Sequence, residues 1–227
     1  LLAPTSLASA PILAVSSVSG VGMDELAAAL LDARAVPAGK PDRGFRLAID
    51  RAFSITGAGT VVTGTVIAGQ THVGDGLTIS PAGREVRVRG LQSAGRKVDA
   101  IGTGDRCALN ISGVDIDDVH RGDWLTAPSV HMASLRFEAD ISILNDRNVA
   151  LRHDTHVHVH HGAARIGARI LTPRQRPLSP GANATVTIAL DAPTALTTGD
   201  RFVLRDGSGR ELIGGGSVLD PLSTLRR

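Results

Sequence analysis

The chain has 227 residues, a formal net charge of +2 and a hydrophobic fraction of 42%. These values indicate packed cores and exclude an extensively disordered protein, and the near-neutral charge does not by itself point to nucleic acid. The aromatic fraction is only 2%, so the cores must consist mainly of Val, Ile, Leu and Ala.

The single cysteine, Cys107, excludes an internal disulfide framework. It lies in an apolar strand pattern, so we expect a buried, inert thiol. No run of 18 apolar residues is present, and we expect no membrane span. The N-terminus lacks the basic region of a signal peptide and does not begin with Met. We therefore expect a fragment of a longer, cytoplasmic protein.

The first 35 residues predict a small α/β unit. Residues 10–15 have the apolar pattern of a short buried strand, and residues 16–22 form a loop of small side chains. From Met23, apolar residues recur at helical spacing, with acidic residues in the first turn. This strand-loop-helix unit, residues 1–35, is too small to fold alone. Residues 36–43 are rich in Pro and Gly and predict a linker.

Residues 44–128 predict an all-β domain. Short strands alternate with turn signals every 8 to 12 residues, a spacing typical of a barrel or a sandwich. The clearest pair of strands lies within Phe45–Gly69, where two β-branched segments are joined by a glycine turn at residues 56–59.

Residues 129–221 predict a second β domain, followed by a tail at 222–227. Leu135 to Ile143 alternate apolar and polar residues, which is the period of a strand. Further strands are expected at residues 156–160, 164–171, 184–190, 201–205 and 217–219. Closure into a barrel would remove the exposed edges of such short strands. The predicted fold is mainly β: two tandem β-barrels preceded by a small α/β remnant.

The first β domain contains a charged pair in an apolar strand. Asp50 and Arg51 lie between apolar neighbours on both sides, where a charge is unfavourable unless an opposite charge meets it. The alternative is that the two side chains point to opposite faces of the strand and that one is simply solvated.

Histidines form a second cluster. His156, His158 and His160 alternate along one predicted strand and so share a face, with His153 and His161 nearby. Three imidazoles on one face can bind a transition metal, but no cysteine accompanies them. A hydrated outer face of the barrel and a contact with RNA phosphates are the other interpretations, and all three stay open.

Several spaced motifs of the first β domain resemble the second domain of translational GTPases of the elongation factor Tu class. They are Gly57-Ala58-Gly59-Thr60-Val61-Val62-Thr63-Gly64, Val73-Gly74-Asp75, Gly104-Asp105 and Arg121-Gly122-Asp123-Trp124-Leu125. The strings at residues 45–53 and 104–111 are more similar still to the selenocysteine-specific elongation factors. The second β domain, ending in Arg201-Phe202-Val203-Leu204-Arg205-Asp206, resembles the third domain of this class, and residues 10–33 resemble the end of its GTPase domain.

The resemblance implies that Asp50, Arg51, Phe53 and Arg106 line a pocket for the aminoacyl end of the tRNA. A selenol is more acidic than a thiol and should be an anion at neutral pH. Two guanidinium groups in an apolar wall would stabilise a selenolate, but would lack an ion-pair partner beside a serine hydroxyl. Asp50 would either hold an arginine in place or accept a hydrogen bond from the α-amino group.

The resemblance also implies contacts with the tRNA stem and with guanine. The stem contacts would be His160, His161, Arg165 and Arg205, which would bind phosphates without reading sequence. Ser16, Ser17 and Val18 would be what remains of the last guanine-contacting loop.

The sequence lacks a phosphate-binding loop, G-x-x-x-x-G-K-[ST], and an Asn-Lys-x-Asp motif. We therefore expect no enzymatic activity, no metal and no cofactor in this chain, while the parent protein would be a GTPase that binds GTP and Mg²⁺. The predicted function is the tRNA-binding portion of a selenocysteine-specific elongation factor, with selenocysteyl-tRNA, the ribosome and the parent's GTPase domain as partners and no membrane partner. The alternatives are the corresponding domains of a general aminoacyl-tRNA-delivering or initiation GTPase, and a structural spacer that transmits the state of the GTPase.

Overall fold

The computed structural model describes residues 7–33, 44–57, 59–145 and 150–223. The chain divides into two compact units, Leu1–Ala38 and Gly39–Arg227, which we describe separately. The expected linker at 36–43 and residues 224–227 of the expected tail lie outside the described residues.

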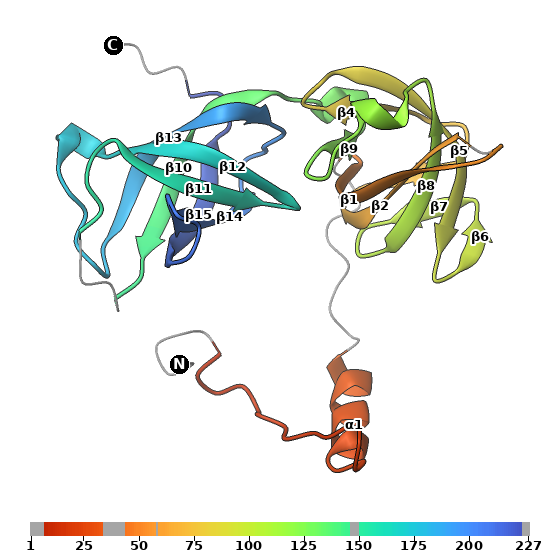
Figure 1. Ribbon diagram of the computed structural model, residues 1–227, viewed down its shortest axis with the longest axis horizontal. Helices are drawn as coiled ribbons and strands as arrows, with labels where there is room; N and C mark the ends of the chain where they lie inside the picture. Colours follow the sequence, from red (N-terminus) through yellow and green to blue (C-terminus); the bar gives the residue numbers. More distant parts are fainter. Residues whose placement is uncertain (1–6, 34–43, 58, 146–149, 224–227) are drawn as a thin grey trace. The chain divides into compact units, whose positions relative to one another are not determined.

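The first unit contains the expected helix but not the expected strand. Helix α1 spans Met23–Ala33 (Figure 1), with Asp24 and Glu25 in its first turn. Residues 10–15 form no strand, and Ile12 is 82% exposed. The prediction of a buried strand was wrong for the described chain because a strand needs a hydrogen-bonding partner, and the described part of this unit provides none. None of the helices in the described ranges has the length and apolar character needed to cross a membrane.

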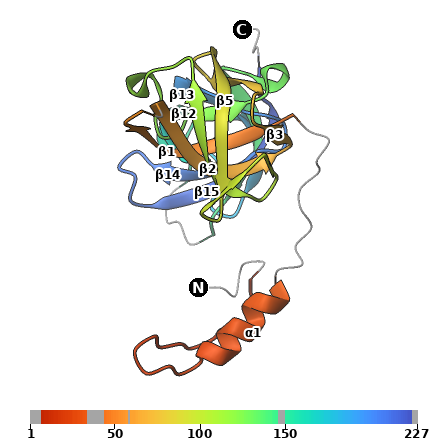
Figure 2. The same ribbon diagram turned by 90° about the vertical axis from the view of Figure 1, so that its right-hand side faces the viewer.

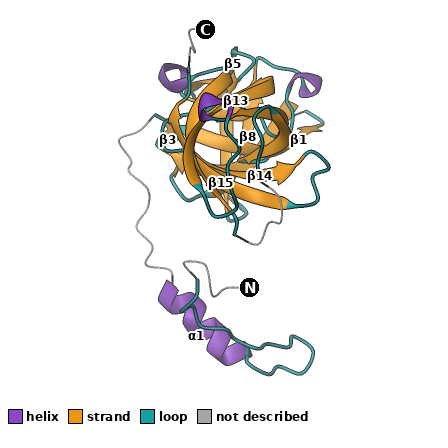
Figure 3. Ribbon diagram, turned by 90° about the vertical axis from the view of Figure 1, so that its left-hand side faces the viewer, coloured by secondary structure: helices purple, strands orange, loops and turns teal. Residues whose placement is uncertain are grey.

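The second unit consists of two antiparallel β-barrels, which confirms the predicted fold class. Strands dominate both (Figure 3). The first barrel (Figure 2) is a sheet in the order β4-β9-β1-β2-β8-β5-β6 that a β4–β5 pairing closes into a ring. Its strands are β1 (Arg46–Ile55), β2 (Gly59–Ala68), β4 (Gly76–Ser80), β5 (Arg84–Ser93), β6 (Arg96–Val98), β8 (Arg106–Ser112) and β9 (Trp124–Thr126), with a separate pair β3 (Gln70–His72) and β7 (Ala100–Gly102). Short 3₁₀ turns, η1 (Ile116–Asp118) and η2 (Pro128–Val130), flank β9.

A β-bulge interrupts strand β1 at Asp50. Ile49 pairs with Gly64 and Arg51 with Thr63, so Asp50 is the extra residue on its strand. Leu47 and Ile49 belong to the core before the bulge, and Ala52 packs against the same core after it. The inward positions therefore shift from odd to even numbers, which leaves both Asp50 and Arg51 on the outer face.

The second barrel closes in the order β10-β13-β12-β11-β14-β15. Its strands are β10 (Ser134–Ile143), β11 (Thr155–His161), β12 (Ala164–Leu171), β13 (Asn183–Thr194), β14 (Arg201–Asp206) and β15 (Leu212–Asp220), and the turn η3 (Pro173–Gln175) follows β12. Inward-facing Val, Ile, Leu and Phe side chains fill its core. Strand β15 begins five residues before the expected position. The prediction missed its first half because that half is rich in glycine, which does not give the β-branched pattern of a strand. A Cβ at Gly214 or Gly216 would lie 2.1 Å from a carbonyl oxygen of β10, so only glycine fits.

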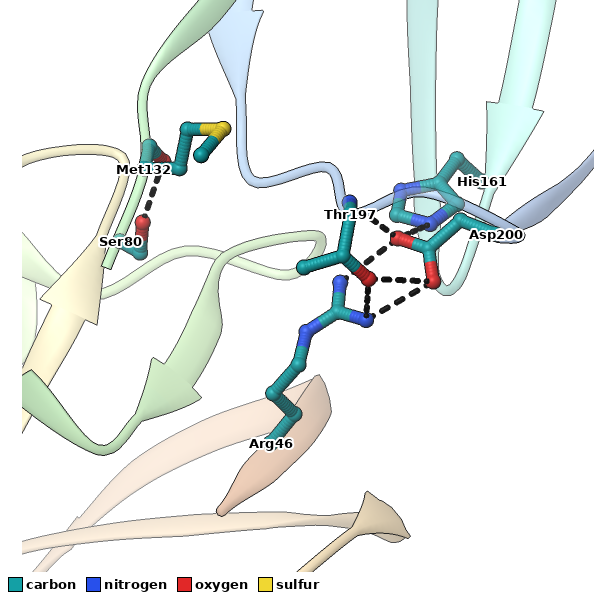
Figure 4. A network of polar contacts seen from close by, with 6 residues as sticks. All are labelled: Arg46, Ser80, Met132, His161, Thr197 and Asp200. Carbon is teal, nitrogen blue, oxygen red and sulfur yellow. Dashed lines mark hydrogen bonds and ion pairs between the residues drawn. The ribbon is translucent and has the colours of Figure 1, made fainter. Parts of the chain in front are cut away.

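A buried polar network joins the two barrels (Figure 4). Arg46, at the start of β1, donates two hydrogen bonds to the carboxylate of Asp200 at 2.8 and 2.7 Å and a third to Thr197 Oγ1 at 2.6 Å. The Thr197 backbone N–H donates to the same carboxylate at 2.9 Å. The Arg46 guanidinium lies 4.5 Å from the ring centre of Trp124, which stacks on His161. His161 Nε2 in turn lies 3.2 Å from Asp200.

The network also determines how Asp200 titrates. Burial would raise the pKa of its carboxyl group, but hydrogen bonds and positive charge from His161 and Arg46 outweigh that effect and hold the pKa well below its ordinary value. The ionised carboxylate is therefore the form that the folded protein favours.

We expect Gly64→Ala to destabilise the protein by about 1–3 kcal/mol, because a Cβ there would lie 2.2 Å from the Ala48 carbonyl oxygen and 2.6 Å from Leu47 Cδ2. Urea denaturation measures the effect. Gly76→Ala is the control, since nothing lies within 4 Å of the added atom. Equal stability of the two variants would contradict the strand pairing described opposite the bulge.

The depressed pKa of Asp200 predicts a pH dependence of stability. In the unfolded chain the pKa of an Asp carboxyl group is about 3.9. The contribution of Asp200 to the free energy of unfolding is therefore fully present above that pH and is lost as the pH falls below it. We expect the free energy of unfolding to fall less between pH 5 and 2.5 in Asp200→Asn than in the parent chain. Asp118→Asn, in an exposed ion pair, serves as the control. Parallel curves for Asp200→Asn and the parent would contradict the assignment.

Candidate functional site

Three neighbouring strands of the first barrel bring charged residues together on its outer face. Asp50 lies in β1, and Arg106 begins β8, two strands away across β2. The two side chains form an ion pair in which Arg106 Nη1 donates to Asp50 Oδ2. Thr63, in the intervening strand, donates from Oγ1 to Asp50 Oδ1 at 2.8 Å. A single carboxylate therefore links all three strands.

These contacts set the charge state of Asp50. Partial burial would raise the pKa of the carboxyl group, but hydrogen bonds from Arg106 and Thr63 and the positive charges of Arg106 and Arg51 lower it. Because the Asp50 side chain is 27% exposed and that of Arg106 59%, water screens the pair considerably.

Arg51 and Phe53 complete the group of residues singled out from the sequence. Arg51 is exposed, and Phe53 is 41% exposed, which is unusual for a large apolar side chain in a strand. We call Asp50, Arg51, Phe53, Thr63 and Arg106 the outer cradle. It carries one carboxylate and two guanidinium groups and therefore a net charge of +1, beside an exposed aromatic ring.

A recess of about 500 Å³ adjoins the outer cradle. Thr63 and Arg106 form one side, and the β5–β6 turn forms the other, with Ala94 at φ 49° and Gly95 at φ 75°. Cys107 also borders the recess, and burial raises the pKa of its thiol to about 12, as expected for an inert thiol. The lining of the recess includes the Arg106 guanidinium group, the Asp105 carboxylate and the apolar Ala108, so it offers a small partner charged and apolar contacts.

The outer face of the second barrel is basic. His156, His158 and His160 alternate with the buried Val157 and Val159, so the three imidazoles share the outer face, as predicted. The outward-facing arginines of the two neighbouring strands lie on the same face: Arg165 and Arg169 in β12, and Arg201 and Arg205 in β14. We call these seven residues the basic face.

The contacts of His158 determine which of its two ring nitrogens carries the proton. Its Nδ1 lies 3.2 Å from the Asp206 carbonyl oxygen and its Nε2 3.2 Å from Arg165 Nη2. A carbonyl only accepts and a guanidinium only donates, so Nδ1 carries the proton and Nε2 accepts. Both nitrogens are thus occupied, and within the described residues no group of three metal-binding side chains is present.

The side chains of the basic face differ in their partners. Arg169 pairs with Asp154 at 3.1 Å, and His156 Nε2 lies 3.5 Å from Asp191. Arg165 and Arg205 have no carboxylate oxygen within 4.0 Å among the residues that the structure describes. Burial, followed by the charges of Arg205 and Arg165, lowers the pKa of His160, so this imidazole is neutral at physiological pH. Arg165 Nη2 donates to His158 Nε2 and Arg205 Nη1 donates to the Gly209 carbonyl oxygen, each at 3.2 Å. These acceptors carry no negative charge, so the positive charge of both arginines is available to an anion.

The position of His161 overturns one expectation. Its side chain is 3% exposed and lies inside the network between the barrels, against Trp124 and Asp200. It follows His160 directly and therefore faces inward where His160 faces outward. A contact between His161 and a tRNA stem is incompatible with this burial, and we remove His161 from the candidate surface.

The loop of small residues in the first unit forms a tight turn. The Ser16 carbonyl accepts a hydrogen bond from Gly20 N–H at 2.9 Å, and Ser16 Oγ accepts one from Ser19 N–H at 3.2 Å. Ser17 is exposed, and Val18 is 98% exposed.

Sequence reasoning missed Thr63, Arg46 and Asp200. Pairing the two strands of the Phe45–Gly69 hairpin would have placed Thr63 opposite Arg51. Arg46 and Asp200 are separated by 154 residues, and no local pattern connects them.

Comparisons with known proteins match both barrels. Residues 59–126 match the family model for elongation factor Tu domain 2, and residues 130–224 match the model for the beta-barrel domain of the selenocysteine-specific elongation factor SelB. A selenocysteine-specific elongation factor of Desulfomicrobium baculatum is 34% identical over 97% of this chain and 35% of its own length. One from Escherichia coli is 32% identical over 93% of this chain and 33% of its own length.

Solved structures agree with these relatives. The apo form of translation elongation factor SelB from Methanococcus maripaludis superposes with a TM-score of 0.77 at 26% identity, covering 91% of this chain and 50% of that one. The chain spans about a third of the length of the two sequence relatives. The chain is thus homologous to the selenocysteine-specific elongation factors over most of its length, and it contains domains 2 and 3 of this type of translation factor.

Proposed function

We propose that this chain is the tRNA-binding portion of a selenocysteine-specific elongation factor, which delivers selenocysteyl-tRNA to the ribosome. The observation that carries the proposal is the linkage of Arg106, Asp50 and Thr63 across three strands, at the positions where the family resemblance implies an aminoacyl pocket. The parent protein would be a GTPase, with GTP and Mg²⁺ held by its preceding domain and the turn at Ser16–Val18 contacting guanine.

The outer cradle has the charge that a selenolate requires. Asp50 compensates one guanidinium group, which leaves a net charge of +1 for an incoming anion. Asp50 Oδ2 accepts a hydrogen bond from Arg106 and Oδ1 accepts one from Thr63, which supports the role of Asp50 in holding Arg106 in place. Each oxygen keeps a second lone pair, so a hydrogen bond from the α-amino group is compatible with these contacts. Serine in place of selenocysteine would bring a neutral hydroxyl to the same cations and lose the charge interaction.

The basic face is proposed to contact the tRNA stem. Arg165, Arg205 and His160 lie on one outer surface, and the two arginines have no acidic partner in the described ranges. Contacts of this kind bind phosphates and supply affinity without reading sequence.

The alternative is a factor that delivers aminoacyl-tRNAs generally. One observation favours it: elongation factor Tu 2 of Streptomyces avermitilis is 30% identical over 92% of this chain. Discrimination between selenocysteyl-tRNA and seryl-tRNA separates the two functions. A structural spacer, the remaining alternative, would show no salt-dependent affinity for tRNA.

We expect Arg106→Ala and Arg51→Ala each to reduce the preference for selenocysteyl-tRNA over seryl-tRNA about tenfold. Desolvated charge pairs couple by about 1.5–7 kcal/mol, and the exposure of Arg106 places this effect at the low end, where about 1.4 kcal/mol is a factor of ten. Competition binding with both aminoacyl forms of one tRNA measures the preference. Arg87→Ala, on the outer face of β5 across the ring from β1, is the control. An unchanged preference in both variants would favour the general factor.

We expect the double variant Arg165→Ala/Arg205→Ala to weaken the binding of acylated and deacylated tRNA equally. Each lost phosphate contact should also reduce the slope of log affinity against log salt by about 0.9 for a duplex stem. Fluorescence anisotropy over a range of salt concentrations gives both quantities. Arg87→Ala/Arg96→Ala removes two exposed arginines from the first barrel as a charge-matched control. If the control and the test variant lose the same affinity, the basic face is not the contact surface.

A further inference from the structure

The network between the barrels is built on the strands that carry both candidate surfaces. Arg46 begins β1, and the outer cradle follows in the same strand at Asp50 and Arg51. Asp200 directly precedes β14, which carries Arg205 of the basic face. His161 ends β11, next to His160. Figure 4 shows Arg46 of the first barrel meeting Thr197 and Asp200 of the second, so the network links the strands of the two surfaces directly.

The geometry of the network is directional. The planar Arg46 guanidinium meets both oxygens of Asp200, so the pair tolerates little rotation in its plane. Thr197 holds the same carboxylate from a second direction, and Trp124 lies over the face of the guanidinium. Close packing adds to this constraint: a Cβ at Gly162 would lie 2.8 Å from the Trp124 ring.

Stability alone is a weak explanation for the network. Arg46 Nε, Trp124 Nε1 and His161 Nδ1 are buried and have no hydrogen-bond partner among the described residues of the protein. A buried ion pair is often no more stable than apolar residues of the same size, because both charges lose their hydration. A bidentate ion pair does, however, impose one relative orientation on the two residues that form it.

From these observations we infer that Arg46 and Asp200 act as positioning residues, which hold the outer cradle and the basic face at the separation that one tRNA spans. The inference rests on the proposed function. Two weak surfaces on a rigid body act together because binding at one raises the effective concentration at the other, and this gain disappears when the geometry is lost. The network thus contributes to tRNA affinity without touching the tRNA.

The test variant is Arg46→Met/Asp200→Asn. It removes both charges of the Arg46–Asp200 ion pair together, and it keeps an oxygen to accept the Thr197 N–H. The control is Arg84→Met/Asp118→Asn, which neutralises an exposed ion pair within the first barrel, with a distance of 2.8 Å between the partners. Two RNA probes separate the surfaces: an intact aminoacyl-tRNA and its acceptor-stem minihelix without the single-stranded 3′ end.

We expect the test variant to bind the intact aminoacyl-tRNA at least tenfold more weakly than the control variant, and to bind the minihelix equally well. We also expect both variants to fold and to unfold cooperatively at pH 7, the test variant at a lower temperature because it lacks the contribution of Asp200 to stability. Unchanged affinity for the intact tRNA would overturn the inference. So would an equal loss for both probes, or a test variant that fails to fold, because the network would then serve stability.

A measurement without tRNA separates this inference from the proposed function. Spin labels at Arg87→Cys in the first barrel and Glu211→Cys in the second report the distance between the barrels by double electron–electron resonance. The native Cys107 is buried and does not take up label. We expect one narrow distance distribution in the parent and the control, and a broad one in the test variant. A narrow distance distribution in the test variant overturns the inference. If the test variant shows the broad distribution but the parent chain does not bind tRNA, only the proposed function is overturned.

Discussion

The orientation of the two barrels depends on one buried carboxylate. Asp200 accepts hydrogen bonds from Arg46, Thr197 and the backbone, and lies beside His161. Each barrel has its own closed sheet and its own core, so neither needs the other to satisfy its backbone hydrogen bonds. A contact between two such self-contained bodies must be specified by side chains, and a bidentate ion pair specifies direction as well as proximity.

The second constraint is the bulge in β1. A regular strand would send Asp50 and Arg51 to opposite faces and place one charge in the core. One extra residue places both on the outer face, where Asp50 reaches Arg106 across the intervening strand. In the sequence, Asp50 and Arg51 have apolar neighbours, although burying a charge is costly. The bulge explains how both hold, because the core-facing apolar neighbours and the two charges lie on opposite sides of the sheet.

The histidine-rich strand shows how one residue step changes a role. His160 and His161 are adjacent, but the alternation of the strand sends the first to the basic face and the second into the contact between the barrels. Both ring nitrogens of His158 have hydrogen-bond partners: Nδ1 donates to the Asp206 carbonyl oxygen and Nε2 accepts from Arg165. His158 therefore helps to hold the Arg165 side chain in place. The positive charge of the basic face therefore lies on its arginines, and His158 and His160 lie among them as polar neighbours.

The sequence alone determined the fold class, helix α1, the outward alternation of the histidines and the family, because period-2 patterning, glycine turns and spaced motifs are local signals. It also singled out Asp50 and Arg106 through the resemblance, but could not say whether they meet. Only the tertiary structure decided that contact, the burial of His161 and the pairing of Arg46 with Asp200 across 154 residues. The physical reason is that register, bulges and barrel closure decide which side chains share a face, and these depend on distant partners. Residues 10–15 also show this dependence on distant partners: they have the apolar pattern of a strand but form none, because the described chain provides no strand beside them.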